Sequence, residues 1–171
     1  LGTDADEPYV KFLPPRIAEA IERAASKLEP ARIGFGSIDD FEHTHTRRWI
    51  LRPDKMRDDP FGRRTVRANM HPGYQNPDAI APSGPVDPQL SMLSVQSADG
   101  TRPIALLANY SMHYFGSPFV SADYFGLFAS KMAAGAGKGN PDFIAMMSQG
   151  TSGDQMWMDY GAPKSAITLE G

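Results

Sequence analysis

The chain reads Ile104-Ala105-Leu106-Leu107-Ala108 within residues 103–110, a continuous apolar run. A run of this length without alternation predicts a strand that is buried on both faces. A helix is expected from Ser121, which can cap it, to about Ala134, and residues 143–147 form a second apolar strand. Strand, helix and strand at this spacing predict a βαβ unit over residues 103–148, with parallel strands and a right-handed crossover.

Three regular segments are predicted before this unit. Apolar residues recur at helical spacing between residues 9 and 28, and residues 31–38 alternate as a strand does. A further strand begins at Gln89 and is joined to residues 103–110 by the hairpin turn Ala98-Asp99-Gly100-Thr101. The sequence therefore predicts an α/β fold, a mixed and mostly parallel sheet with flanking helices.

Residues 39–88 follow neither the helical nor the strand period. Structureless connections longer than about 15 residues are uncommon in compact domains and are functional or disordered. This one carries too many apolar side chains for a disordered linker, among them Trp49, Phe61 and Tyr74. We expect a long, irregular but ordered excursion that covers another part of the molecule.

Composition excludes several classes of protein. The 171 residues include no cysteine, so disulfide scaffolds and cysteine-ligated metal sites are excluded. A net charge of -3 argues against binding nucleic acid through bulk charge. No run of 18 apolar residues is present, so no membrane-spanning segment is expected.

One stretch departs from this acidic balance. Residues 47–67 hold eight Arg and Lys against three Asp. Arginines there could recognise a carboxylate or phosphate, or could bind nucleic acid with Trp49, Phe61 and Tyr74 as stacking platforms. A solvated loop with internal salt bridges is the favoured interpretation of this stretch.

Chemistry is expected at the ends of the two parallel strands, where ligands bind in open α/β sheets. His113 follows the first strand and is placed to be a metal ligand or a general base, or else is satisfied by backbone partners. The loop Gly150-Thr151-Ser152-Gly153-Asp154 follows the second strand, and its N–H groups could cradle an anion. Parallel strand ends share one edge, so His113 and this loop are expected to converge.

Two other motifs are open to more than one interpretation. His43-Thr44-His45 places two imidazoles on one side of a strand, where they could share a zinc ion if a third ligand were present. Met156-Trp157-Met158, with Met146 and Met147, is typical of core or interface packing, and a substrate-facing apolar wall is the alternative.

Taken in order, these segments resemble a known family. The series runs from the strand at residues 31–38, through Asn109-Tyr110-Ser111-Met112-His113 and Ser121-Ala122-Asp123, to the loop 150–154. It is similar to the N-terminal catalytic region of neutral/alkaline non-lysosomal ceramidases, in particular a divergent bacterial ceramidase-like branch. The resemblance implies a partial catalytic domain over residues 1–171 of a zinc-dependent amidohydrolase of sphingolipid metabolism. It also implies an extracellular or periplasmic location.

The resemblance assigns roles to individual residues. His113 corresponds to a zinc ligand, and the other ligands are expected outside this chain. The family's Gly-Asp-x-Ser loop aligns with Gly153-Asp154-Gln155-Met156, so a methionine stands where the family has its active-site serine. The candidate catalytic residues are therefore Asp154, Ser152 and Thr151. The candidate substrate-binding residues are Asn109, Gly150, Gly153, Trp157 and Arg48.

The implied activity is hydrolysis of the N-acyl amide bond of a ceramide-like lipid, with a small-molecule or lipid substrate and no nucleic-acid partner. The sequence makes no prediction of oligomeric state. Because Met156 interrupts the serine pattern, a related hydrolase acting on another ester or amide is one alternative. A non-catalytic carbohydrate- or lipid-binding module on a decayed hydrolase fold is the other. His43-Thr44-His45-Thr46 looks like the family's first zinc motif but follows the first helix and strand, and we interpret it as a coincidence.

Overall fold

The computed structural model describes residues 6–169, and the chain divides into two compact units, one up to Ala31 and one from Arg32 onward. The first unit contains the helix α1 (Glu7–Ala25). Asp6 caps it, since its side chain accepts a hydrogen bond from the Tyr9 N–H at 3.1 Å. The helix begins and ends earlier than the pattern predicted, and Pro14 and Pro15 lie within it. None of its residues is buried.

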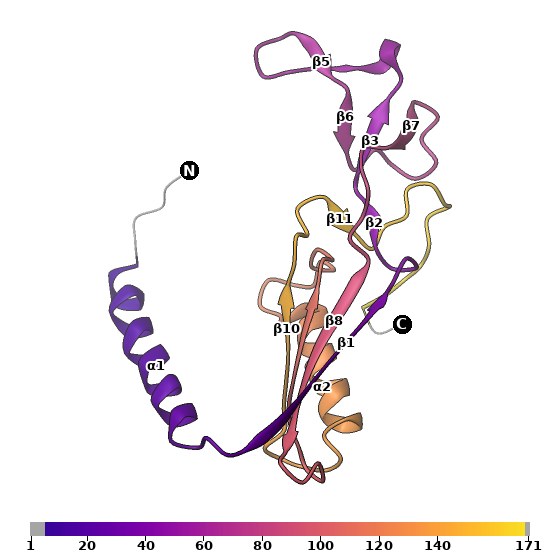
Figure 1. The fold of residues 1–171 in the computed structure, drawn as a ribbon. Helices are drawn as coiled ribbons and strands as arrows, with labels where there is room; N and C mark the ends of the chain where they lie inside the picture. Colours follow the sequence, from indigo (N-terminus) through magenta and orange to yellow (C-terminus); the bar gives the residue numbers. More distant parts are fainter. Residues whose placement is uncertain (1–5, 170–171) are drawn as a thin grey trace. The chain divides into compact units, whose positions relative to one another are not determined.

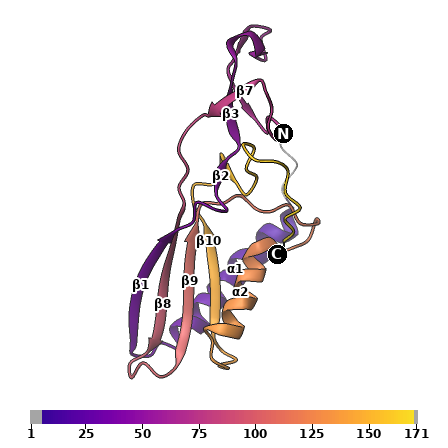
Figure 2. The same cartoon turned by 90° about the vertical axis from the view of Figure 1, so that its right-hand side faces the viewer.

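The second unit is built on a four-stranded sheet in the order β1-β8-β9-β10 (Figure 1). Its strands are β1 (Ala31–Asp39), β8 (Gln89–Ser97), β9 (Pro103–Tyr110) and β10 (Ile144–Gln149). β9 pairs antiparallel with β8 and parallel with β10. The helix α2 (Asp123–Gly135) joins β9 to β10 and packs against β10 (Figure 2). The mixed α/β sheet and its parallel βαβ unit are therefore confirmed.

Two details of this unit differ from the prediction. β9 is not buried on both faces, because Ala108 and Tyr110 are buried while Leu107 stays 40% exposed. Met146, paired with Leu107 on β10, is also exposed, so this face of the two strands is not covered as the other is. Ser121 does not cap α2. Its hydroxyl instead accepts from the N–H of Asp123, the first helical residue, at 3.0 Å.

The excursion between β1 and β8 is more regular than the sequence indicated. It holds six short strands: β2 (His45–Thr46), β3 (Arg48–Leu51), β4 (Arg57–Asp58), β5 (Arg64–Val66), β6 (Ala68–Met70) and β7 (Ala79–Pro82). β6-β3-β7 form one small sheet and β4-β5 another, while β2 pairs with β11 (Gln155–Met156). Strands of two to four residues are too short to show a period, which is why the pattern missed them. No helix in residues 6–169 is long and apolar enough to cross a membrane.

Candidate functional site

The two strand-end segments lie side by side, because β9 and β10 are parallel neighbours in register from Ala105 and Ile144 onward. The N–H of Gly150 donates to the carbonyl of Tyr110 at 2.9 Å, which continues the ladder past β10. The N–H of His113 donates to the carbonyl of Gln155 at 3.3 Å. The structure thus brings His113 and the glycine loop to the same edge of the sheet.

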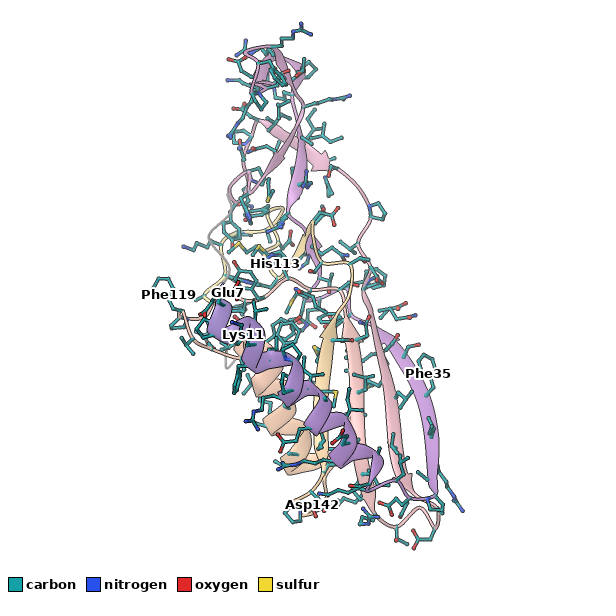
Figure 3. The ribbon with its side chains drawn as sticks, turned by 90° about the vertical axis from the view of Figure 1, so that its left-hand side faces the viewer. Glu7, Lys11, Phe35, His113, Phe119 and Asp142 are labelled. Atoms are coloured by element: carbon teal, nitrogen blue, oxygen red, sulfur yellow. The ribbon has the colours of Figure 1, made fainter. Side chains whose placement is uncertain are left out.

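His113 is half-buried at this edge, between the main sheet and the small strands of the excursion (Figure 3). Its Nδ1 lies 3.4 Å from the carbonyl oxygen of Tyr114, and its ring packs on the Tyr114 ring with centroids 4.2 Å apart. Within residues 6–169 no protein group bonds to its Nε2. This nitrogen is therefore available to a ligand or a proton, and the ring is not enclosed by hydrocarbon.

A buried polar network supports the glycine loop from beneath. The Ser111 hydroxyl donates to Asp87 at 2.7 Å and accepts from the Thr151 N–H at 3.2 Å. The buried Gln155 side chain accepts from the Asp87 N–H at 2.7 Å and donates to the Thr151 carbonyl at 2.9 Å. A Cβ on Gly150 would lie 2.4 Å from the Ser111 hydroxyl oxygen. Glycine is therefore required at this position for the loop to reach the network.

The outer half of the loop is held by Arg47. Its guanidinium donates from Nε and Nη2 to the carbonyl of Gly153, at 3.0 and 2.5 Å, and its N–H donates to the carbonyl of Asp154 at 2.8 Å. The N–H groups of Gly153 and Asp154 donate to no acceptor within residues 6–169. The arrangement leaves two backbone donors pointing at no protein group.

The loop side chains occupy different environments. Thr151 is exposed, and Ser152 and Asp154 are half-buried. Met156 is 8% exposed and pairs opposite His45 in the small β11-β2 sheet. This position, where the resemblance places a serine, therefore holds a core side chain and carries no hydroxyl chemistry.

A pocket of about 530 Å³ opens beside this edge, and neither His113 nor the loop 150–154 is among the residues that line it. Trp157 lines it, stacked on Phe115 with ring centroids 4.5 Å apart and donating from Nε1 to the Phe115 carbonyl at 3.2 Å. Met112 adds to the apolar wall. Arg48 and Asn109 do not line this pocket. Arg48 is exposed on β3, and the Asn109 amide donates to the Ser148 hydroxyl at 2.8 Å.

His43 is the imidazole that lines this pocket, a role that the sequence analysis did not assign to it. Its Nδ1 bonds both oxygens of Asp40 at 3.0 Å, and Tyr110 donates to the same carboxylate at 3.2 Å. Partial burial raises the pKa of Asp40, but the hydrogen bonds from His43 and Tyr110 outweigh it and leave that pKa below its usual value. Burial raises the pKa of Tyr110 to about 12. The other histidine of this motif, His45, lines a different pocket, and its Nε2 is bonded to the Glu42 carbonyl at 3.0 Å.

His71 was also missed by the sequence analysis, because nothing in its spacing connects it with the strand ends. Its Nδ1 bonds the hydroxyl of the buried Tyr160 at 2.5 Å, and its backbone has a positive φ of 54°. Partial burial lowers the pKa of His71, and the charges of Arg47 and His113 lower it further. A second imidazole therefore stands near His113.

Asp123 anchors the segment between His113 and α2. Its carboxylate accepts from the N–H groups of Phe115, Gly116 and Ser117 at 2.7, 3.0 and 3.0 Å. Partial burial raises the pKa of Asp123, but these bonds and one from the Tyr124 N–H outweigh it and bring it to about 2. Asp123 also has a positive φ of 50°, which aspartate and asparagine tolerate better than most residues.

We expect Asp123→Asn to lower the free energy of unfolding at pH 7 by about 1–2 kcal/mol, since hydrogen bonds to a charged acceptor are lost. A carboxylate with a lowered pKa stabilises the fold above its ordinary pKa and loses that contribution as the pH falls through the folded value. The difference between the wild type and the variant should therefore shrink between pH 3.8 and about 2. Urea denaturation across this range measures it. A difference that does not change with pH would show that the charge of Asp123 does not anchor the segment.

The residues present do not by themselves form a metal centre. Among residues 6–169 no group of three or more His, Asp or Glu side chains is placed to hold a metal ion. His113 supplies one imidazole at the strand edge, and a zinc site requires at least three protein ligands.

Comparison with known proteins shows similarity at the level of the fold. No family model and no curated protein matches the sequence. A neutral ceramidase from Pseudomonas aeruginosa is similar in structure, with 22% identity and a TM-score of 0.51 over 82% of this chain and 19% of that chain. A ceramidase complexed with C2 is similar at 22% identity and a TM-score of 0.50, over 80% of this chain and 18% of that chain. The chain spans less than a fifth of the length of these ceramidases, and it shares a ceramidase-like fold with that part of them.

Proposed function

We propose that this chain is part of a hydrolase that resembles the neutral ceramidases and cleaves the N-acyl amide bond of a ceramide-like lipid. One observation carries the proposal: His113 and the loop 150–154 meet at the carboxyl edge of two parallel strands in a ceramidase-like fold. That edge is where ligands bind in open α/β sheets.

The proposed roles of the residues follow from their contacts. The free N–H groups of Gly153 and Asp154 hold the oxygen of the amide carbonyl as negative charge develops on it, and Arg47 keeps them in place. The apolar wall of Trp157 and Met112 takes the hydrocarbon part of the substrate. The loop contributes the side chains of Asp154, Ser152 and Thr151 to the proposed site. The buried Met156 takes no part in the chemistry.

His113 is the one residue of this chain that we propose as a zinc ligand. A zinc ion would polarise the amide carbonyl and lower the pKa of its bound water. Residues 6–169 do not complete a zinc site. We propose that the remaining ligands come from outside this chain, which corresponds to about a fifth of the similar ceramidase. An extracellular or periplasmic location belongs to the same proposal.

The test uses the full-length protein of which this chain is proposed to be a part. It is incubated with a fluorescent N-acyl sphingoid amide and with an ester of the same acyl chain, with and without a zinc chelator. We expect hydrolysis of the amide that the chelator removes and added zinc restores. Hydrolysis of the ester alone would replace the proposed substrate with another acyl compound. Binding of both lipids without hydrolysis would identify a lipid-binding module instead.

The substrate-binding role of Trp157 is expected to be separable from that of Arg48, since Trp157 lines the pocket and Arg48 does not. Trp157→Ala should raise KM for long-chain amides by about tenfold, because truncation removes buried apolar contact worth about 1.5–3 kcal/mol. Arg48→Ala, its control, should leave KM unchanged. Equal KM values across acyl-chain lengths in Trp157→Ala and the wild type would remove Trp157 from the substrate site.

A further inference from the structure

An exposed aromatic side chain stands at the turn of a well-ordered hairpin. β4 and β5 pair antiparallel, and residues 59–63 between them turn away from β3, β6 and β7 (Figure 1). We call residues 57–66 the basic hairpin. Phe61, in its turn, is 88% exposed. A phenylalanine this exposed loses the favourable burial that its side chain would otherwise gain.

The turn holds Phe61 outward by specific hydrogen bonds. The Asp59 carboxylate accepts from the N–H groups of Phe61 and Arg63, both at 2.9 Å, and from the Thr65 hydroxyl at 2.9 Å. The backbone N–H of Asp59 donates to the Arg63 carbonyl at 2.7 Å. The exposed ring therefore sits on a preorganised turn, and little ordering entropy is lost when it binds a partner.

The surrounding charge is strongly positive. Residues 47–67 carry eight basic and three acidic side chains, a net charge of +5 in a chain of net charge -3, so the remaining residues together carry -8. Arg52 pairs with Asp54 at 3.1 Å and Lys55 with Asp78 at 3.7 Å. Arg57 and Arg63 of the hairpin are exposed and have no ion pair within the described residues. Within the hairpin itself Arg57, Arg63 and Arg64 outnumber Asp58 and Asp59 by one, so the attraction for an anionic partner comes from the wider stretch 47–67 with the hairpin at its tip.

The remaining aromatic residues of this region argue against single-stranded nucleic acid. Trp49 is half-buried, and its Nε1 donates to the carbonyl of Thr46 at 3.3 Å. Tyr74 is half-buried and packs on Tyr160 with ring centroids 5.2 Å apart. Stacking several successive bases requires several open rings, and only Phe61 of the three predicted platforms is open. One aromatic ring flanked by arginines is the arrangement that suits the headgroup region of a bilayer.

We propose that the basic hairpin docks this protein on anionic lipid bilayers. Phe61 enters the boundary between headgroups and acyl chains, and Arg57 and Arg63 bind lipid phosphates. Each basic residue near an anionic surface contributes a modest electrostatic attraction, and the ring adds apolar burial. The inference goes beyond the proposed hydrolase and does not depend on it, because it concerns attachment to the surface and not the lipid that is cleaved.

The experiment measures co-sedimentation of the full-length protein with phosphatidylcholine vesicles, pure or containing 30 mol% phosphatidylglycerol, at about 0.1 M salt, where surface charge is screened beyond about 10 Å. We expect binding to the anionic vesicles only. The double variant Arg57→Gln/Arg63→Gln should bind about 30-fold more weakly, at roughly a fivefold loss for each arginine. Phe61→Ser should bind about tenfold more weakly.

The matched control is Phe35→Ser. Phe35 is 74% exposed and lies on β1, in a different sheet from the hairpin (Figure 3). Its substitution should leave vesicle binding unchanged, and circular dichroism should show both serine variants folded. Equal losses in Phe35→Ser and Phe61→Ser would overturn the proposal, as would equal binding to pure and anionic vesicles or no binding to either. Tighter binding to single-stranded DNA than to the anionic vesicles would overturn it in favour of nucleic acid.

Because the vesicles contain no amide-linked lipid, the two proposals fail separately. Vesicle binding without any hydrolase activity in the full-length protein would support the proposed membrane docking and would rule out the proposed hydrolase activity. Activity on a detergent-dispersed substrate without vesicle binding would support the proposed hydrolase and would rule out the membrane docking.

Discussion

Replacing His113 by alanine is expected to lower kcat/KM of the full-length protein for an N-acyl amide by more than about 100-fold. Removing even a residue that only hydrogen-bonds to a metal ligand lowers metal affinity or activity by about 10–100-fold. The zinc content per chain, measured by atomic absorption after dialysis, should fall with it. The physical reason is that His113 presents an Nε2 without a partner among residues 6–169 at the strand edge, beside the loop that we propose holds the substrate carbonyl.

The control for this substitution is His45→Ala. His45 is also half-buried, but its Nε2 is bonded to the Glu42 carbonyl at 3.0 Å and it lines a different pocket. Its activity and zinc content should match the wild type. If His113→Ala retained its zinc and its activity, His113 would not be a ligand, and the proposed role of the strand edge would have to be withdrawn.

Gly150→Ala is expected to lower the free energy of unfolding by about 2–3 kcal/mol, the usual cost of forcing an atom into a packed site. The new Cβ would lie 2.4 Å from the Ser111 hydroxyl and 3.1 Å from the Asn109 amide oxygen. Ser111 cannot move without losing its bonds to Asp87 and Thr151. For a chain of this size the midpoint of thermal unfolding should fall by about 6–9 °C.

Gly153→Ala is the matched control, since Gly153 lies in the same loop and no atom stands within 4 Å of the position that a Cβ there would take. Its unfolding free energy should stay within about 0.5 kcal/mol of the wild type. Thermal unfolding followed by circular dichroism distinguishes the two variants. Equal stability of Gly150→Ala and Gly153→Ala would contradict the close approach of the loop to Ser111.

The sequence alone determined the central βαβ unit and the place where its strands end. The apolar run 104–108 and the apolar strand near residue 144 are local signals, and the parallel pairing follows from the length of the connection between them. From this the meeting of His113 with the glycine loop could be predicted. The same argument overestimated the burial of β9, because a run of apolar residues does not reveal whether a second layer covers both faces.

Only the tertiary structure decided what surrounds that edge. The short strands β2 to β7 have no period of their own. β2 exists because the distant strand β11 completes its hydrogen bonds, and β3 is paired by β6 and β7. Thr46 and Arg47 hold the loop at Gly153 and Asp154 across more than a hundred residues, and Asp87 reaches Ser111 across 24 residues. Sequence spacing carries no information about such contacts. Long-range pairing therefore decided that His43 lines the pocket and that His71 stands near His113. The exposure of Phe61 is likewise seen only in the structure, where local bonds within its turn hold it outward.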